Sequence, residues 1–208
     1  MRITATGFAL LAQIAQRPSS AYELTRVMRQ SLHYLWPRAE SRLYGEVAQL
    51  EKAGLIEGRD ENVGRRVRRI MTVTGAGRLA LREWIAADVA AGIPLESEAL
   101  LRVFFASWGS VDDLRRALTR VQADAREMLE VAQSVGFAYL EGAGSAPDQA
   151  PARAMIHELL AGYALLLAEW STTQLRETAT WKDLRAEDKK SRARRKFAAT
   201  MRRLRRGS

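Results

Sequence analysis

The sequence of 208 residues has no cysteine, two histidines and no long apolar run. The absence of cysteine excludes disulfides, thiolate zinc sites and cysteine nucleophiles, and it is typical of proteins from a reducing compartment. No stretch approaches the roughly 20 apolar residues that a membrane-spanning helix needs. The N-terminus also lacks the basic start and the longer apolar core of a secretory signal. These absences favour a cytoplasmic protein with no membrane partner.

Residue patterns for catalysis are also scarce. Neither His33 nor His157 stands in the sequence beside a nucleophile or a pair of carboxylates. The Gly75-Ala76-Gly77 segment lacks the remainder of a dinucleotide-binding fingerprint, and the sequence has no glycine-rich phosphate loop. We therefore expect no enzymatic activity, no cofactor and no metal site.

The formal net charge of +9 is distributed unevenly. Residues 1–93 carry 14 Lys and Arg against 9 Asp and Glu, whereas residues 94–185 carry 9 against 13. Residues 186–208 carry 10 against 2. A basic first part, an acidic middle and a basic tail indicate that only some parts of the chain meet a polyanion.

The first part of the sequence predicts three helices. Apolar residues at helical spacing favour a helix over residues 6–16, with Thr6 as its cap. Residues 20–23 have the S-x-x-E form of a capping box, which marks the start of a second helix. A third helix over residues 39–52 carries one apolar stripe and ends before Gly54, a common C-terminal cap. The stripe consists of Leu43, Val47 and Leu50.

A β-hairpin and a fourth helix are predicted next. Residues 57–69 place glycines, aspartate and asparagine between runs that favour strands. In the arm after Gly64 the side chains alternate as far as Thr74, which is a suitable cap for another helix. Three helices, a two-stranded ribbon and a return helix are the element order of a winged helix-turn-helix.

The pattern after the predicted boundary at Gly92-Ile93-Pro94 is helical. A short helix is expected over residues 97–108, and Ser110 caps a long one. Two apolar seams, separated by a loop at residues 142–151, pair with each other, with a second chain, or with both, and we expect both. The seams are Leu114, Leu118, Val121, Ala125, Met128, Ala132, Val135 and Tyr139, and then Ala152, Ile156, Leu159, Tyr163, Leu166 and Trp170.

The expected fold is therefore mainly α, with an N-terminal winged helix-turn-helix (three helices plus a two-stranded wing) followed by a long-helix C-terminal dimerisation domain. The predicted domains are a winged-helix DNA-binding domain at residues 1–93, a helical dimerisation and effector domain at residues 94–185, and a basic tail at residues 186–208. The expected partners are double-stranded DNA and a second copy of the chain.

Three segments resemble the PadR family of bacterial transcription regulators, namely FALLAQIAQRPSSAYEL, SRLYGEVAQLEKAGLIE and RRVRRIMTVTGAGR. The resemblance covers residues 5–86 and implies a DNA-binding regulator, most often a repressor. It also implies that some members bind small aromatic or cationic apolar effectors. The matching positions are Tyr22, Tyr44, the Leu-Glu-x-x-Gly-Leu-Ile run at 50–56, Arg66, Arg68, Thr74 and Gly77. The departures are Ala21 for glycine, Ser41-Arg42 for Gly-Thr, Gly45 for proline and Met71 for an aromatic residue.

The third helix is the predicted recognition helix. Its apolar stripe turns Arg42, Glu46 and Gln49 outward, and a helix in the major groove reads bases with such polar side chains. Arg42 either contacts a guanine or pairs with Glu46 one turn later. Tyr44 either hydrogen-bonds a phosphate or packs as a half-buried ring on the second helix. The predicted DNA contacts on the helices are Tyr22, Arg38, Ser41, Arg42, Tyr44 and Gln49.

The predicted wing carries four arginines beside Gly64. Such a hairpin suits contacts to phosphates or to the minor groove, although Glu57, Asp60 and Glu61 stand close enough to neutralise part of the charge. We expect at least two of the four to contact DNA. The arginines are Arg65, Arg66, Arg68 and Arg69, of which Arg65, Arg66 and Arg68 are the predicted contacts.

The basic tail has three interpretations: an additional DNA-binding arm, an amphipathic helix that docks on the partner chain, or an unstructured, solvated end. Phe197, Met201 and Leu204 stand at helical spacing in it, which also permits a membrane-surface helix with few apolar anchors. An effector pocket between helices is a further hypothesis, against the alternative that its aromatic residues form core and interface. The candidate pocket residues are Trp84, Phe104, Trp108 and Trp170.

Three functional hypotheses result. The favoured one is a sequence-specific, ligand-responsive transcriptional repressor. The alternatives are a nonspecific architectural nucleic-acid binder, in which the tail and wing dominate, and a helical protein–protein adaptor. Affinity for a palindromic duplex relative to a random one separates these hypotheses.

Overall fold

The structure is a computed structural model that describes residues 3–31, 34, 36, 40–63, 66–88, 95–142 and 149–207. The chain divides into two compact units, Met1–Ile93 and Pro94–Ser208. Five sequence predictions lie outside the described residues or side chains. They are Arg38, Arg65, the side chains of Ser41 and Arg66, and the boundary at residues 92–94.

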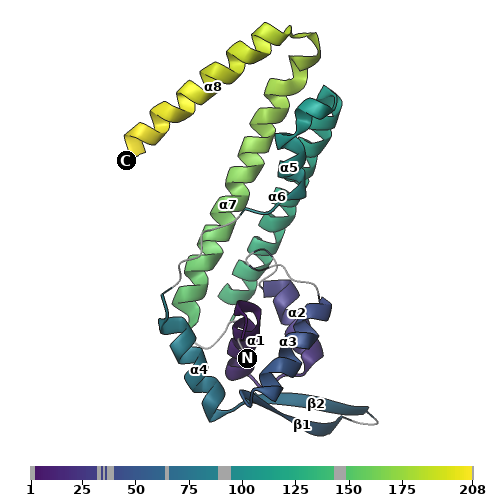
Figure 1. Cartoon of the computed structure of the whole chain (residues 1–208), viewed down its shortest axis with the longest axis vertical. Helices are drawn as coiled ribbons and strands as arrows, with labels where there is room; N and C mark the ends of the chain where they lie inside the picture. Colours follow the sequence, from purple (N-terminus) through teal and green to yellow (C-terminus); the bar gives the residue numbers. More distant parts are fainter. Residues whose placement is uncertain are drawn as a thin grey trace. The chain divides into compact units, whose positions relative to one another are not determined.

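The first unit has the predicted element order of a winged helix-turn-helix (Figure 1). The strands β1 and β2 pair antiparallel, with Ile56 opposite Val73 at one end and Val63 opposite Arg66 at the other. The elements are α1 (Ala5–Gln16), α2 (Ala21–Ser31), α3 (Glu40–Lys52), β1 (Ile56–Val63), β2 (Arg66–Val73) and α4 (Gly75–Ala86).

One apolar cluster unites the helices α1, α2 and α3 with the base of the wing. The predicted stripe of α3 is buried in it, and so is Met71 of β2. Helix α4 is attached to α1 by a stacked pair of rings, Phe8 and Trp84, whose centroids lie 5.1 Å apart. The buried cluster consists of Leu10, Leu11, Ile14, Leu24, Met28, Leu43, Val47, Leu50, Ile56 and Met71.

Most helix ends of this unit follow the predicted caps. The backbone N–H of Ser20 donates to Glu23 Oε2 at 2.9 Å, and the N–H of Glu23 donates to Ser20 Oγ at 3.3 Å, which confirms the capping box. Thr74 accepts a hydrogen bond from the N–H of Gly77 at 3.0 Å. Gly54 has a φ of 68°, the left-handed conformation that glycine adopts readily after a helix.

The predicted Thr6 cap is wrong. Helix α1 begins at Ala5, and the N-cap is Thr4, whose hydroxyl accepts from the N–H of Gly7 at 3.1 Å. Thr6 is instead buried and accepts a hydrogen bond from Trp36 Nε1 at 3.0 Å. Threonine is a suitable N-cap at either position. Thr6 is buried inside the helix, so the cap falls on Thr4.

The second unit is built on a long helical hairpin, in which α6 packs along α7 and α5 packs on α6 (Figure 1). The short helix expected over residues 97–108 ends at Phe104, and a separate 3-10 turn follows. The elements are α5 (Glu98–Phe104), η1 (Ala106–Trp108), α6 (Val111–Leu140), α7 (Ala150–Glu177), η3 (Thr178–Asp183) and α8 (Ala186–Gly207).

The two predicted seams behave differently. On α6, Leu118 and Val121 of the seam are buried within the chain. On α7 the fully buried residues are Ala164 and Ser171, whose small side chains let the helices approach closely. Leu159, a member of the predicted α7 seam, is 62% exposed. Leu159 and Leu166 of the α7 seam therefore lie outside the contact that α7 makes within its own chain, whereas Tyr163 and Trp170 are half-buried.

The basic tail forms the helix α8, which excludes the interpretation as an unstructured end. Its side chains are mostly exposed, and Lys196 Nζ joins it to α7 by donating to Gln174 Oε1 and Glu177 Oε2, each at 2.5 Å. In the described part of the chain no helix is long and apolar enough to cross a membrane.

Substitution of Gly77 by alanine should destabilise the first unit. A Cβ at Gly77 would lie 2.1 Å from the backbone oxygen of Leu55, so the turn between α3 and β1 would have to move. We expect Gly77→Ala to lower the free energy of unfolding by about 1–3 kcal/mol in urea denaturation. The matched control is Gly75→Ala in the same helix, where a Cβ meets nothing within 4 Å. The control should be neutral or stabilising by up to about 1 kcal/mol, and equal losses for both variants would contradict the prediction.

Candidate nucleic-acid interface

The outward face of α3 is polar and exposed. Leu43 and Leu50 hold the opposite face in the core, so Arg42, Tyr44 and Gln49 are left in solvent. Tyr44 is 47% exposed, which is compatible with both the predicted phosphate contact and the half-buried ring. A helix with one face fixed and the other lined by long polar side chains can enter a major groove.

Glu46 does not lie on this outward face, contrary to the sequence prediction. It is only 7% exposed, and its Oε1 accepts a hydrogen bond from the Thr4 hydroxyl at 2.7 Å. The alternative in which Glu46 pairs with Arg42 is therefore wrong. Within the described residues Arg42 has no ion pair, so its guanidinium is available to a ligand.

The start of α2 and the wing are joined by an ion pair. Arg68 Nη2 on β2 lies 2.8 Å from Glu23 Oε1 and 3.2 Å from Ser20 Oγ. The backbone N–H of Ser20 lowers the pKa of Glu23, the Ser20 hydroxyl and Arg68 lower it further, and burial acts in the opposite direction. Tyr22, between the two cap residues, is 64% exposed on the outer side of α2.

The backbone also holds the wing in place. The N–H of Ser19 donates to Met71 O at 3.1 Å, and the N–H of Met71 donates to Ser19 O at 3.0 Å.

Arg69 pairs with two acidic side chains: its Nη2 lies 2.5 Å from Glu51 Oε1 and its Nη1 lies 3.4 Å from Asp60 Oδ1. The hydrogen bond that Arg69 donates to Glu51 raises the pKa of Arg69.

The two wing arginines whose side chains are described, Arg68 and Arg69, both have protein partners. Arg68 makes the contact to α2 and Arg69 the contact to α3 and β1. Sequence reasoning allowed for neutralisation within the wing, but it missed Glu23 and Glu51. Both lie on helices, and no local spacing relates them to the hairpin.

The predicted effector residues are divided between the two units. Trp84 belongs to the first, where it stacks on Phe8. In the second, Phe104 packs edge-on against Phe105 with centroids 4.9 Å apart, Trp108 is 91% exposed and Trp170 is half-buried. Phe104 and Trp108 form an exposed aromatic surface at the end of α5.

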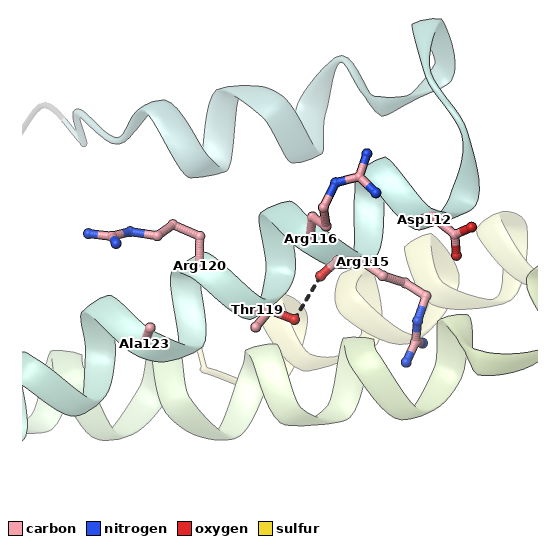
Figure 2. A pocket seen from close by; sticks show the side chains of 6 residues that line it. All are labelled: Asp112, Arg115, Arg116, Thr119, Arg120 and Ala123. Carbon is pink, nitrogen blue, oxygen red and sulfur yellow. Dashed lines mark hydrogen bonds between the residues drawn. The ribbon is translucent and has the colours of Figure 1, made fainter.

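A groove of about 610 Å³ on α6, which sequence reasoning missed, holds three arginines. Arg115 Nη1 donates to Leu175 O at 2.6 Å and to Thr178 Oγ1 at 3.1 Å, so it caps the end of α7. Arg116 pairs with Asp113, and Arg120 with Asp124. Figure 2 shows that the three guanidinium groups point in different directions, so the groove does not focus them on one ligand. Its lining residues are Asp112, Arg115, Arg116, Thr119, Arg120 and Ala123.

The buried stripe of α3, its exposed polar face and the wing anchored at Ser19 define the class of winged helix-turn-helix proteins. Residues 10–83 match the model of the family described as "Transcriptional regulator PadR-like family". The first unit therefore carries a PadR-like domain of this family. The matched residues fall within the span over which the sequence resembles that family.

Known proteins show the same similarity. A probable transcriptional regulator of Mycobacterium tuberculosis, Rv1176c, is 23% identical over 137 residues, which are 61% of this chain and 72% of that protein. PadR of Bacillus subtilis, solved in complex with operator DNA, matches with a TM-score of 0.69 and 19% identity over 84% of this chain and 99% of that one. The same protein in complex with p-coumaric acid matches with a TM-score of 0.63, 19% identity and the same coverage. The PadR fold therefore extends beyond the first unit.

The capping box gives a pH-dependent prediction. Because the pKa of Glu23 is lower in the folded chain than its ordinary 4.5, its carboxylate stabilises the fold above about pH 4.5, and this contribution is lost as the pH falls through the lowered value. Glu23→Gln should therefore lower the free energy of unfolding by about 1 kcal/mol at neutral pH. The deficit should shrink below about pH 4.5 in urea denaturation followed by circular dichroism.

Arg17→Gln is the matched control for the charge near the cap. Arg17 lies 3.6 Å from the same carboxylate, but its side chain is 74% exposed, so its removal should change the free energy of unfolding by less than about 0.5 kcal/mol. A Glu23→Gln deficit that stays constant down to acid pH would show that the cap does not act through its carboxylate.

Proposed function

We propose that this PadR-like regulator is a homodimeric, sequence-specific DNA-binding repressor that responds to a small effector. The observation that carries the proposal is the exposed face of α3, where Arg42 and Gln49 lie in solvent above a buried stripe. In this function α3 enters the major groove, Arg42 contacts a guanine, and Tyr22, Tyr44 and Ser41 contact phosphates. Arg38 supports the entry of the helix, and such a regulator acts in the cytoplasm.

The wing would contact the backbone or the minor groove beside α3. Arg65 and Arg66 are the proposed phosphate contacts, because Arg69 is occupied by Glu51 and Asp60. Arg68 has a role in both states: it pairs with Glu23 in the free protein, and its side chain remains 39% exposed toward a phosphate.

Dimerisation through residues 94–185 is supported by the apolar surface that one chain leaves in solvent. Leu159 and Leu166 of the α7 seam are each 62% exposed, and a second copy would cover them. A two-fold dimer would place its recognition helices about 34–36 Å apart, one turn of duplex, so the operator should be a palindrome.

Effector binding is supported by the exposed aromatic surface of Phe104 and Trp108 and by the similarity to a PadR solved with p-coumaric acid. We propose a small aromatic or cationic apolar effector, with Trp84 and Trp170 as further candidates for its pocket. An effector that alters the spacing of the two recognition helices would release the operator and relieve repression.

The test is a comparison of duplexes at about 0.15 M salt. A palindromic fragment selected from random duplexes should bind at least about a thousandfold more tightly than a random duplex. Equal affinity with a steep salt dependence would favour the nonspecific architectural binder, for which the basic α8 is the supporting observation. Absence of duplex affinity in low salt would leave the protein–protein adaptor.

Arg42→Ala should lower the preference for the selected duplex over a random one. Loss of a base contact costs about 1–3 kcal/mol on the specific site alone. Arg66→Ala should weaken both duplexes alike, because a phosphate contact carries no sequence information. Fluorescence anisotropy with both duplexes measures the ratio.

Arg102→Ala controls for the loss of one positive charge. Arg102 lies on α5 and pairs with Glu98 at 2.6 Å, so its removal should leave the preference unchanged. An unchanged preference for Arg42→Ala as well would show that α3 does not read bases through this residue.

A further inference from the structure

Helix α8 carries its large apolar side chains along one stripe. Phe197 on this stripe is 75% exposed. The side of α8 that contacts the same chain is a polar one, because Lys196 reaches Gln174 and Glu177 of α7. The stripe is thus turned away from its own α7. It consists of Ala193, Phe197, Met201 and Leu204.

Helix α7 carries a matching stripe on the side opposite α6. Met155, Leu159 and Leu166 are 70%, 62% and 62% exposed, whereas Ala164 on the opposite side is fully buried. Three positions of the two stripes share one spacing. Met155, Leu159 and Leu166 on α7 recur at the intervals of Ala193, Phe197 and Leu204 on α8.

The charges around the two stripes are complementary. Residues 186–208 carry 10 Lys and Arg against 2 Asp and Glu, whereas residues 124–169 carry 2 against 7. Arg194 and Arg205 flank the α8 stripe eleven residues apart, and Glu158 and Glu169 flank the α7 stripe at the same interval. When each helix is viewed from its N-terminus, the two arginines lie on one side of the α8 stripe and the two glutamates lie on the other side of the α7 stripe. Such flanks face each other when two helices run parallel.

We propose that α8 of one copy packs parallel to α7 of a second copy, with its apolar stripe on the exposed α7 stripe. Phe197 then lies against the partner's Leu159, and Leu204 against the partner's Leu166. The interface is isologous, so each dimer contains the contact twice. This inference rests on the proposed homodimer and names the segment that covers α7 in it.

The direction of α8 supports a second copy as the occupant. Figure 1 shows that α8 turns back at the end of α7, so it runs against the direction of its own α7. If the α7 helices of two copies lie antiparallel, each α8 begins near the start of the partner's α7 and runs along it. A DNA duplex would pair with the arginines of α8 but would leave Phe197 and Met201 in water. DNA as a partner therefore accounts for the charge of α8 but not for its apolar stripe.

Charge reversal in the full chain tests the pairing. One variant carries Arg194→Glu and Arg205→Glu, and the other carries Glu158→Arg and Glu169→Arg. Each alone should raise the dimer dissociation constant about tenfold or more in sedimentation equilibrium, because both contacts become repulsive. An equimolar mixture should recover the native constant within about threefold, because in the mixed dimer each α8 faces a complementary α7.

The matched control reverses Arg195 and Arg206, which have the same spacing on the opposite side of α8. Their reversal should leave the dissociation constant unchanged. Three outcomes would overturn the proposal: no weakening by either variant, no recovery in the mixture, or equal weakening by the control. Recovery in the mixture also shows that both variants are folded.

Cross-linking gives an independent readout, because the chain has no cysteine of its own. Phe197→Cys mixed with Leu159→Cys should form a disulfide-linked dimer under mild oxidation. Leu165→Cys, which is 59% exposed but off the stripe, should not link to Phe197→Cys. Equal linkage at residues 159 and 165, or linkage at neither, would contradict the register.

The native chain separates this inference from the proposed function. If the native chain is a dimer that binds its selected duplex, but the charge variants leave the dimer dissociation constant unchanged, only the α8 contact is overturned. A native monomer without duplex affinity would overturn the proposed function itself. Phe197→Ala could instead abolish binding to vesicles or to a duplex and leave dimerisation unchanged. That result would assign the stripe to a membrane or to DNA, and it would overturn the second-copy contact.

Discussion

The exchange of two backbone hydrogen bonds between Ser19 and Met71 fixes the wing against the helices, and the arrangement of the first unit depends on it. The bonded segment stands directly before α2, and the Met71 side chain is buried in the same core as α3. Both the backbone and the side chain of Met71 thus attach the wing to the helices. Ser20, the next residue, caps α2 and meets Arg68 from β2, so a short stretch of chain sets the position of α2 and β2 together.

Much of the first unit could be predicted from the sequence because its signals are local. The capping box at Ser20, the cap at Thr74 and the left-handed Gly54 each depend on neighbours within a few residues. The position of Glu46 could not be predicted in this way. Its partner Thr4 stands 42 residues earlier, so no local pattern around α3 indicates the contact. The partners of Arg68 and Arg69 could not be predicted either, because Glu23 and Glu51 are also distant in the sequence.

The second unit shows where a repeating pattern is ambiguous. A seam of apolar residues identifies a face that will be covered, but it does not say by what. On α6 the seam packs within the chain at Leu118 and Val121, whereas on α7 small residues at Ala164 and Ser171 form the internal contact. Charge is ambiguous too. The basic tail suggests a polyanion, yet Lys196 already meets a glutamate of its own α7, so acidic helices are an equally good partner for it.

The burial of Glu46 also links two positions that are far apart in the sequence. A Cβ at Gly7 would lie 2.9 Å from Glu46 Oε2 and 2.8 Å from the side chain of Ile3, so a side chain at position 7 requires these two side chains to shift or to be shorter. In the evolution of such a domain these positions should change together, with a small residue at one and a long acid at the other, or the reverse. The packing of α3 therefore depends in part on the N-terminal turn of α1.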